Sequence, residues 1–120
     1  MAKGDDIQER LIQFAARVIK VCNALPKTAE GKHIAGQLLR SATAPAPNHG
    51  EARSAESASD FVHKLKISVK ELNESEVWMR MIIASDLIDA YRLAPLLDEC
   101  IQLQRILNAS IKTARDTAKR

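Results

Sequence analysis

Apolar residues recur at steps of three and four along most of the chain, which is the period of an amphipathic α-helix. The first such stretch spans about Asp5 to Ala24 and ends before Pro26. The third spans about Ser57 to Ser85, and the fourth begins near Arg92, after a connection formed by residues 86–91. The strict alternation of apolar and polar residues that marks a half-buried strand is absent. The pattern predicts helices and no sheet.

Prolines interrupt the second helical stretch. It begins at about residues 28–31 and meets Ala44-Pro-Ala-Pro47 before the helical pattern resumes at Asn48. A proline lacks an amide donor and its ring clashes with the preceding turn, so Pro45 and Pro47 are expected to kink or locally unwind this helix.

Four amphipathic helices joined by short connections pack most simply as antiparallel neighbours. The predicted fold class is therefore all-α, an antiparallel up-and-down four-helix bundle whose second helix is kinked at Pro45 and Pro47. A chain of 120 residues fits one domain, spanning residues 1–120.

The first and fourth helices carry apolar residues outside their main stripes. These residues are Ile12, Ile19, Leu96 and Leu103. Large exposed apolar patches are rare on soluble monomers, so the four side chains are expected to form an oligomer interface. A single type of head-to-tail contact closes into a ring when the rotation between subunits permits it.

Basic residues concentrate at the C-terminal end. The whole chain has a net charge of only +3, which by itself does not imply nucleic acid. The segment from Arg105 to Arg120 alone counts +4, because five cations face Asp116 as the single acid. The cations are Arg105, Lys112, Arg115, Lys119 and Arg120. They either offset the helix macrodipole on a solvated surface or contact a polyanion.

Polar side chains occupy positions on the second and third helices where apolar ones were expected. They are Gln37, Arg40, Ser41, Asn48, Glu51, Glu71 and Glu74. If the two helices pack side by side, Arg40 can meet Glu71 or Glu74, and Asn48 can satisfy carbonyls freed by the prolines. The set is interpreted as a structural polar network that fixes helix register, or as solvated surface.

Signatures of catalysis are weak. Helix bundles build carboxylate-bridged metal centres from Glu-x-x-His motifs, and the chain offers Glu30-Gly-Lys-His33 and the aspartate variant Asp60-Phe-Val-His63. The other carboxylates lie at different levels of the predicted bundle, which makes a metal-bundle enzyme the least favoured alternative. No nucleophile elbow or glycine-rich phosphate loop is present. The sequence predicts no catalytic residue, no metal and no cofactor.

The expected cellular location rests on the absence of a signal region and of a membrane span in the sequence. The N-terminal residues have no apolar signal region, and no run approaches the roughly 18 apolar residues of a membrane span. Cys22 and Cys100 fall in apolar stripes, where reduced core cysteines are expected. The expectation is a cytoplasmic protein that does not contact a membrane.

Four short segments carry a family resemblance. They are Gln37-Leu-Leu-Arg-Ser41, Asn48-His-Gly-Glu51-Ala, Asp60-Phe61 and Lys70-Glu71-Leu-Asn-Glu74. In order and spacing the chain resembles the small four-helix bundle proteins encoded in intervening sequences of bacterial large-subunit ribosomal RNA genes. The resemblance runs from Phe14 to about Lys112.

The resemblance implies a ring-shaped homo-oligomer, commonly a pentamer. The accessory protein of diversity-generating retroelements looks like a relative, which implies a basic ring surface associated with nucleic acid and with a reverse-transcriptase partner. This chain departs from the usual Ser-Ile-Pro-Ala-Asn-Ile-like turn at Thr43-Ala-Pro-Ala-Pro-Asn-His49. The resemblance supplies no family-wide catalytic residues.

The favoured interpretation is a non-enzymatic, self-assembling helical protein that binds RNA or other nucleic acid through the basic C-terminal residues. The main alternative is an adaptor that binds another protein and uses its cations only for solubility.

Overall fold

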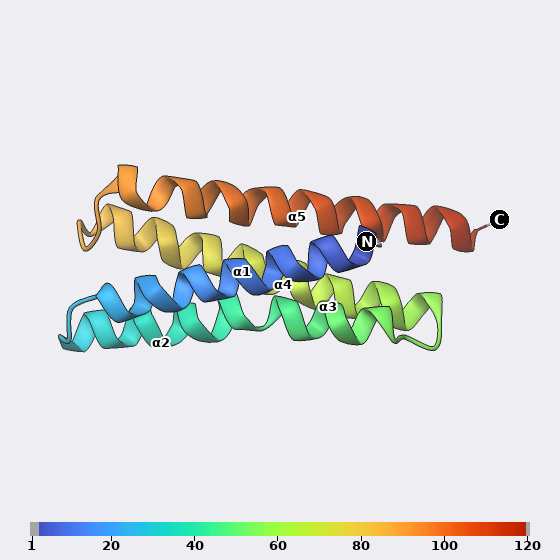
Figure 1. The fold of residues 1–120 in the computed structure, drawn as a ribbon, viewed down its shortest axis with the longest axis horizontal. Coiled ribbons are helices and arrows are strands. Elements are labelled where there is room, and N and C mark those ends of the chain that lie inside the picture. The colour runs from blue at the N-terminus through green and yellow to red at the C-terminus, as the bar shows by residue number, and fades with distance from the viewer. Residues whose placement is uncertain (1–2, 120) are drawn as a thin grey trace.

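The structure, a computed structural model, describes residues 3–119 and is built from helices (Figure 1). They are α1 (Lys3–Ala24), α2 (Ala29–Thr43), α3 (Pro45–Arg53), α4 (Ala58–Ala84) and α5 (Ala90–Ala118). Helices α2 and α3 follow each other as one broken rod, so the molecule is an up-and-down bundle of four antiparallel rods measuring 52 × 25 × 23 Å. The predicted fold class is confirmed, and residues 3–119 contain no strand.

Side-chain caps begin two of the helices. The hydroxyl of Thr28 accepts the amide of Gly31 at 3.1 Å, and the hydroxyl of Ser57 accepts the amide of Asp60 at 3.0 Å. Each contact satisfies an amide that the first helical turn leaves without a partner. Helix α5 begins at Ala90, slightly earlier than the sequence pattern indicated.

The second rod breaks at Ala44, where α3 begins with Pro45 at its first position. A missing amide costs nothing at the first position of a helix, so the proline starts a new helix instead of distorting an old one. Asn48 donates its side-chain amide to the Ala44 carbonyl at 3.0 Å. Ser68 of α4 donates to the Pro45 carbonyl at 3.2 Å and thereby ties the break to the neighbouring helix.

The core-facing side of α5 differs from the one expected. Leu96 and Leu103 are 4% and 0% exposed, so they belong to the core and the prediction that they form an outer stripe was wrong. Leu97 and Ile106, which flank this side, are only half-buried. The residues of α5 that line the core are Leu93, Leu96, Cys100, Leu103, Leu107 and Ile111.

Helices α4 and α5 extend beyond the start of α1. In Figure 1 the first turn of α1 lies part-way along α5, and the last turns of α5 project past it. Arg10 of α1 donates two hydrogen bonds, of 2.6 and 3.0 Å, to the carboxylate of Glu99 in α5. This contact between α1 and α5 involves the N-terminal half of α5 and not its C-terminal end. The C-terminal part of α5 therefore has a large solvent-facing surface. None of the described helices is both long and apolar enough to cross a membrane.

Two glycines of α2 provide a matched test of this packing. A Cβ atom on Gly31 would lie 2.0 Å from the Pro26 carbonyl oxygen, whereas a Cβ atom on Gly36 would meet nothing within 4 Å. We expect Gly31→Ala to destabilise the protein by about 1–3 kcal/mol because the backbone must move. Gly36→Ala should stabilise it by about 0.5–1 kcal/mol, because alanine is the better helix former. Urea unfolding of both variants checks this, and equal effects would contradict the packing.

Candidate functional site

The basic residues predicted from the sequence share one side of α5. Arg105, Lys112, Arg115 and Lys119 are all exposed. At 3.6 residues per turn, their positions fall within an arc of about 80°. Arg120 was predicted with them but lies outside the described residues. The four described cations form a basic stripe along the C-terminal half of α5.

The cations of the basic stripe form no ion pairs. Within residues 3–119, none of the four lies within 4.0 Å of a carboxylate oxygen, although one acid, the exposed Asp116, lies on the same side of α5. Arg10 and Arg53, by contrast, each hold a carboxylate at 2.6 Å. Cations without partners leave a positive potential that attracts anions.

A surface hollow of about 420 Å³ lies between the side chains of α4 and α5, at the end where the basic stripe lies. Arg115 contributes to it from α5, and His63 and Lys66 contribute from α4. Small and aliphatic side chains complete its walls: Ala58, Ser59, Val62, Ala114 and Ala118. The sequence pattern pointed to His63 only as a possible metal ligand, and it did not point to Lys66. The available signal was the spacing of three and four residues that places Ser59, His63, Lys66 and Lys70 on one face of α4.

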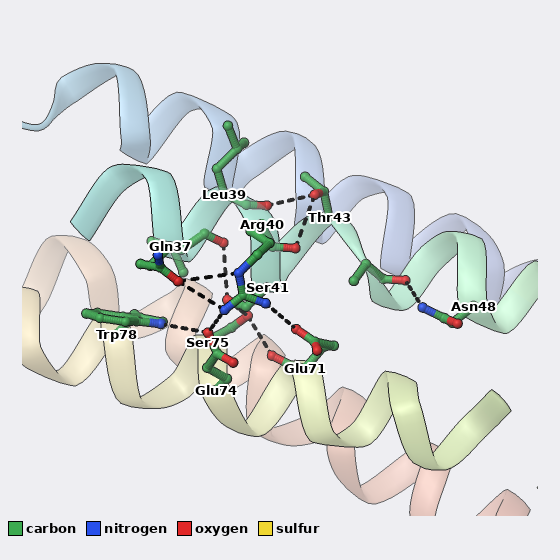
Figure 2. Close-up of polar contacts among 12 residues, drawn as sticks. Gln37, Leu39, Arg40, Ser41, Thr43, Asn48, Glu71, Glu74, Ser75 and Trp78 are labelled. Atoms are coloured by element: carbon green, nitrogen blue, oxygen red, sulfur yellow. Dashed lines mark hydrogen bonds and ion pairs between the residues drawn. The ribbon is translucent and has the colours of Figure 1, made fainter. Parts of the chain in front are cut away.

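The predicted polar network is only partly assembled (Figure 2). Arg40 of α2 binds Glu71 of α4 at 3.2 Å and also contacts the Glu74 carboxylate. Gln37 accepts from Arg40 at 3.1 and 3.3 Å, and the Trp78 indole donates to Glu74 at 3.0 Å. Because the Arg40 side chain is 51% exposed, this group is a surface clamp between α2 and α4.

The remaining members of that set lie elsewhere. Ser41 and Ser75 are fully buried, and their hydroxyls lie 2.9 Å apart across the interface of α2 and α4. Asn48 donates to the Ala44 carbonyl at the break between α2 and α3. The carboxylate of Glu51 lies 3.8 Å from the ammonium group of Lys64. These contacts connect helices and place no reactive group in a cavity.

His49 is the one histidine that is buried. Its Nδ1 lies 2.5 Å from the Gln8 side-chain oxygen, while the Gln8 amide donates to the Ala46 carbonyl at 3.1 Å. Burial lowers the pKa of His49, and the nearby charge of Arg53 lowers it further. His49 therefore joins α3 to α1 through Gln8.

The possible metal ligands do not gather. Among residues 3–119, no three His, Cys, Asp or Glu side chains come together in a way that would hold an ion. In the first candidate motif, His33 instead packs edge-on against Trp78, with ring centroids 5.9 Å apart. In the second, His63 lines the hollow between α4 and α5.

Both cysteines are free and buried, as the sequence predicted. Burial raises the pKa of the Cys22 thiol, and it raises the pKa of Cys100 to about 12. Thiols with raised pKa values are poor nucleophiles at neutral pH, so neither cysteine resembles a catalytic residue.

Of the four residues predicted to form an oligomer interface, two remain on the surface. Ile12 and Ile19 of α1 are each 42% exposed, whereas Leu96 and Leu103 are in the core. Three further large aliphatic side chains are exposed: Leu39, Val77 and Met81.

These features define a class of protein, a small helical bundle with an exposed basic surface. Residues 5–109 match the family of 23S rRNA-intervening sequence proteins, and the chain belongs to that family. A crystal structure of a protein of unknown function from the S23 ribosomal protein family of Bacteroides thetaiotaomicron superimposes with a TM-score of 0.86. The two sequences are 28% identical over 92% of this chain and 99% of the other. Among curated proteins, nothing matches the sequence significantly.

The exposure of Arg40 predicts a small energetic role for the surface clamp. Replacing Arg40 by Ala should lower the free energy of unfolding by about 1 kcal/mol or less, because water screens exposed ion pairs. Arg17→Ala removes an exposed arginine that has no ion pair within residues 3–119 and serves as the control. Denaturant melts compare the two variants. A loss of about 3 kcal/mol or more for Arg40→Ala would instead indicate a buried charge pair.

Proposed function

We propose that this protein is a non-enzymatic, self-assembling helical bundle that binds a nucleic acid through the basic stripe of α5. The observation that carries the proposal is the exposure of four cations on one side of the helix without a carboxylate partner in the described chain. Arg120 continues the same run in the sequence. Membership of the rRNA-intervening sequence protein family supports RNA as the ligand, and a cytoplasmic location is part of the proposal.

The physical mechanism is electrostatic. Each cation that neutralises a phosphate releases condensed counterions, so affinity accumulates over several weak contacts and falls steeply with salt. An assembly presents the stripe several times, and linked weak contacts raise the overall affinity without any new type of contact.

A pair of charge reversals tests the ligand. We expect the wild type to bind a fluorescent RNA stem-loop at low salt, with affinity decreasing linearly on a plot of log Kd against log salt. Arg105→Glu combined with Lys112→Glu should weaken binding by about tenfold or more, because two attractive contacts become repulsive. The control combines Lys27→Glu with Lys32→Glu, two exposed lysines outside the stripe. No binding by the wild type at low salt would refute the nucleic-acid part of the proposal.

Exposed apolar side chains on two sides of the bundle support self-assembly. Ile19 of α1 and Leu39 of α2 lie at one level, since the helices are antiparallel and Cys22 meets the Ala35 carbonyl at 3.4 Å. Val77 and Met81 are exposed on α4, which packs against α2, α3 and α5 and lies across the bundle from α1. Two different patches on different sides suit a head-to-tail contact, which closes into a ring when the geometry permits.

Assembly is measured by light scattering. We expect a wild-type mass several times that of one chain, with five copies as the family resemblance implies. Ile19→Glu should reduce this mass because a charge would be buried at the contact. Gln13→Glu, at an exposed position of the same helix, is the matched control. A monomeric wild type, or an Ile19→Glu variant that remains helical and assembles unchanged, would contradict the proposal.

The exposed apolar residues also suit a foreign protein, which keeps an adaptor function as the second candidate. Affinity capture from the natural host separates the two possibilities. Recovered RNA favours the first function, whereas one stoichiometric protein partner without RNA favours the adaptor.

A further inference from the structure

The outward side of α4 is as basic as that of α5. Lys66, Lys70 and Arg80 are exposed on this helix. The four acids of α4 are half-buried: Asp60, Glu71, Glu74 and Glu76. No acid is therefore among the exposed residues of α4, although the helix is 27 residues long.

The basic sides of α4 and α5 meet at the hollow described above. Lys66 and Arg115 both line it, although they lie far apart in the sequence. Lys70 follows Lys66 by four residues and therefore lies on the same side of α4, one turn nearer the middle of the bundle. Glu76 is the acid of α4 that contacts α5, and its carboxylate accepts a hydrogen bond from Gln104 at 2.9 Å. The cations of the two helices thus border one surface, the α4–α5 face, which consists of Lys66, Lys70, Arg105, Lys112, Arg115 and Lys119.

Within residues 3–119, the only aromatic ring on the α4–α5 face is the imidazole of His63, which lines the hollow, and no Phe, Tyr or Trp ring lies there. Phe14 is buried, and Phe61 is half-buried in another groove, which also contains Ile7 and His49 and shares Ala114 with the hollow. Trp78 is held by Glu74 on the side of α4 that faces α2, and Tyr91 lies at the opposite end of α5 from the hollow. Proteins that bind single strands use such rings as stacking platforms. The α4–α5 face can therefore contact phosphates at several points but offers unpaired bases only one small ring, that of His63.

The geometry of the face suits a rigid ligand. At 1.5 Å per residue, Arg105 and Lys119 lie about 21 Å apart along α5. A duplex carries one charge per roughly 1.7 Å of its axis and holds these charges in a fixed array. A single strand would first have to be straightened, at a cost in conformational entropy that stacking on the single ring of His63 would offset only in part.

We propose that the α4–α5 face binds the phosphate backbone of a nucleic-acid duplex and that a phosphate group enters the hollow between Lys66 and Arg115. This inference rests on the proposed function and adds two features to it. The ligand is double-stranded, and Lys66 and Lys70 of α4 take part together with the basic stripe.

Fluorescence anisotropy with three probes of equal length tests the ligand class: an RNA duplex, a DNA duplex and one of the RNA strands alone. We expect both duplexes to bind at least about tenfold more tightly than the single strand. A tighter RNA duplex would mean that the face prefers A-form geometry, and equal duplexes would mean that phosphates alone are recognised. Both results support the proposal. Equal or tighter binding of the single strand would overturn it while leaving the proposed function intact, and failure of all three probes would overturn both.

Two lysine substitutions test the position of the face. Lys66→Ala and Lys70→Ala should each weaken duplex binding about fivefold to tenfold and reduce the salt slope by about one, as expected for the loss of one phosphate contact. Lys27→Ala, an exposed lysine in the turn between α1 and α2, is the matched control and should change neither quantity. If duplex affinity is the same in Lys66→Ala, Lys70→Ala and the control, α4 does not take part and the assignment of the face is wrong.

Discussion

The packing of α4 against α5 is the contact on which the rest of the bundle depends. These are the two longest helices, with 27 and 29 residues, and they run antiparallel over most of their length. Leu65 and Leu72 of α4 and Leu103 and Leu107 of α5 are almost completely buried. The Cys100 thiol reaches the Leu72 carbonyl at 3.2 Å, which illustrates how closely the helices approach. Since apolar residues occupy the inner sides, the charged residues of both helices are directed to the outer surface, where the candidate interface lies.

The second rod of the bundle is broken between α2 and α3, and the break changes how its polar groups are satisfied and which helices α3 contacts. Pro45 starts α3 at a position where its missing amide is harmless, and Asn48 and Ser68 supply donors near the break. The break lets α3 contact both α4 and α1, with Gln8 bonded to His49 and to the Ala46 carbonyl. The polar residues of this rod are therefore explained by connections between helices. Within residues 3–119, the cations of the α4–α5 face form no ion pair that connects helices.

Much of this arrangement could be predicted from the sequence, because helical periodicity, caps and prolines act locally. The interruption at Pro45, the start of α4 near Ser57 and the reduced cysteines are examples. The core-facing side of α5 could not be settled in this way. Leu96 and Leu97 are adjacent and equally apolar, so only tertiary packing decides which of them turns inward. The sequence also could not predict that Lys66 and Arg115 line the same hollow, because this depends on the register between two helices.

Footprinting of lysine side chains by acetylation, with and without an RNA duplex, tests most directly whether the α4–α5 face is the binding surface. The reagent labels exposed amines, and a bound phosphate backbone shields those that it contacts. The structure predicts that the duplex protects Lys66, Lys70, Lys112 and Lys119, all exposed on α4 and α5, while Lys27 remains as reactive as in the free protein. Protection of Lys27 with unchanged labelling of the α4 and α5 lysines would contradict the assignment.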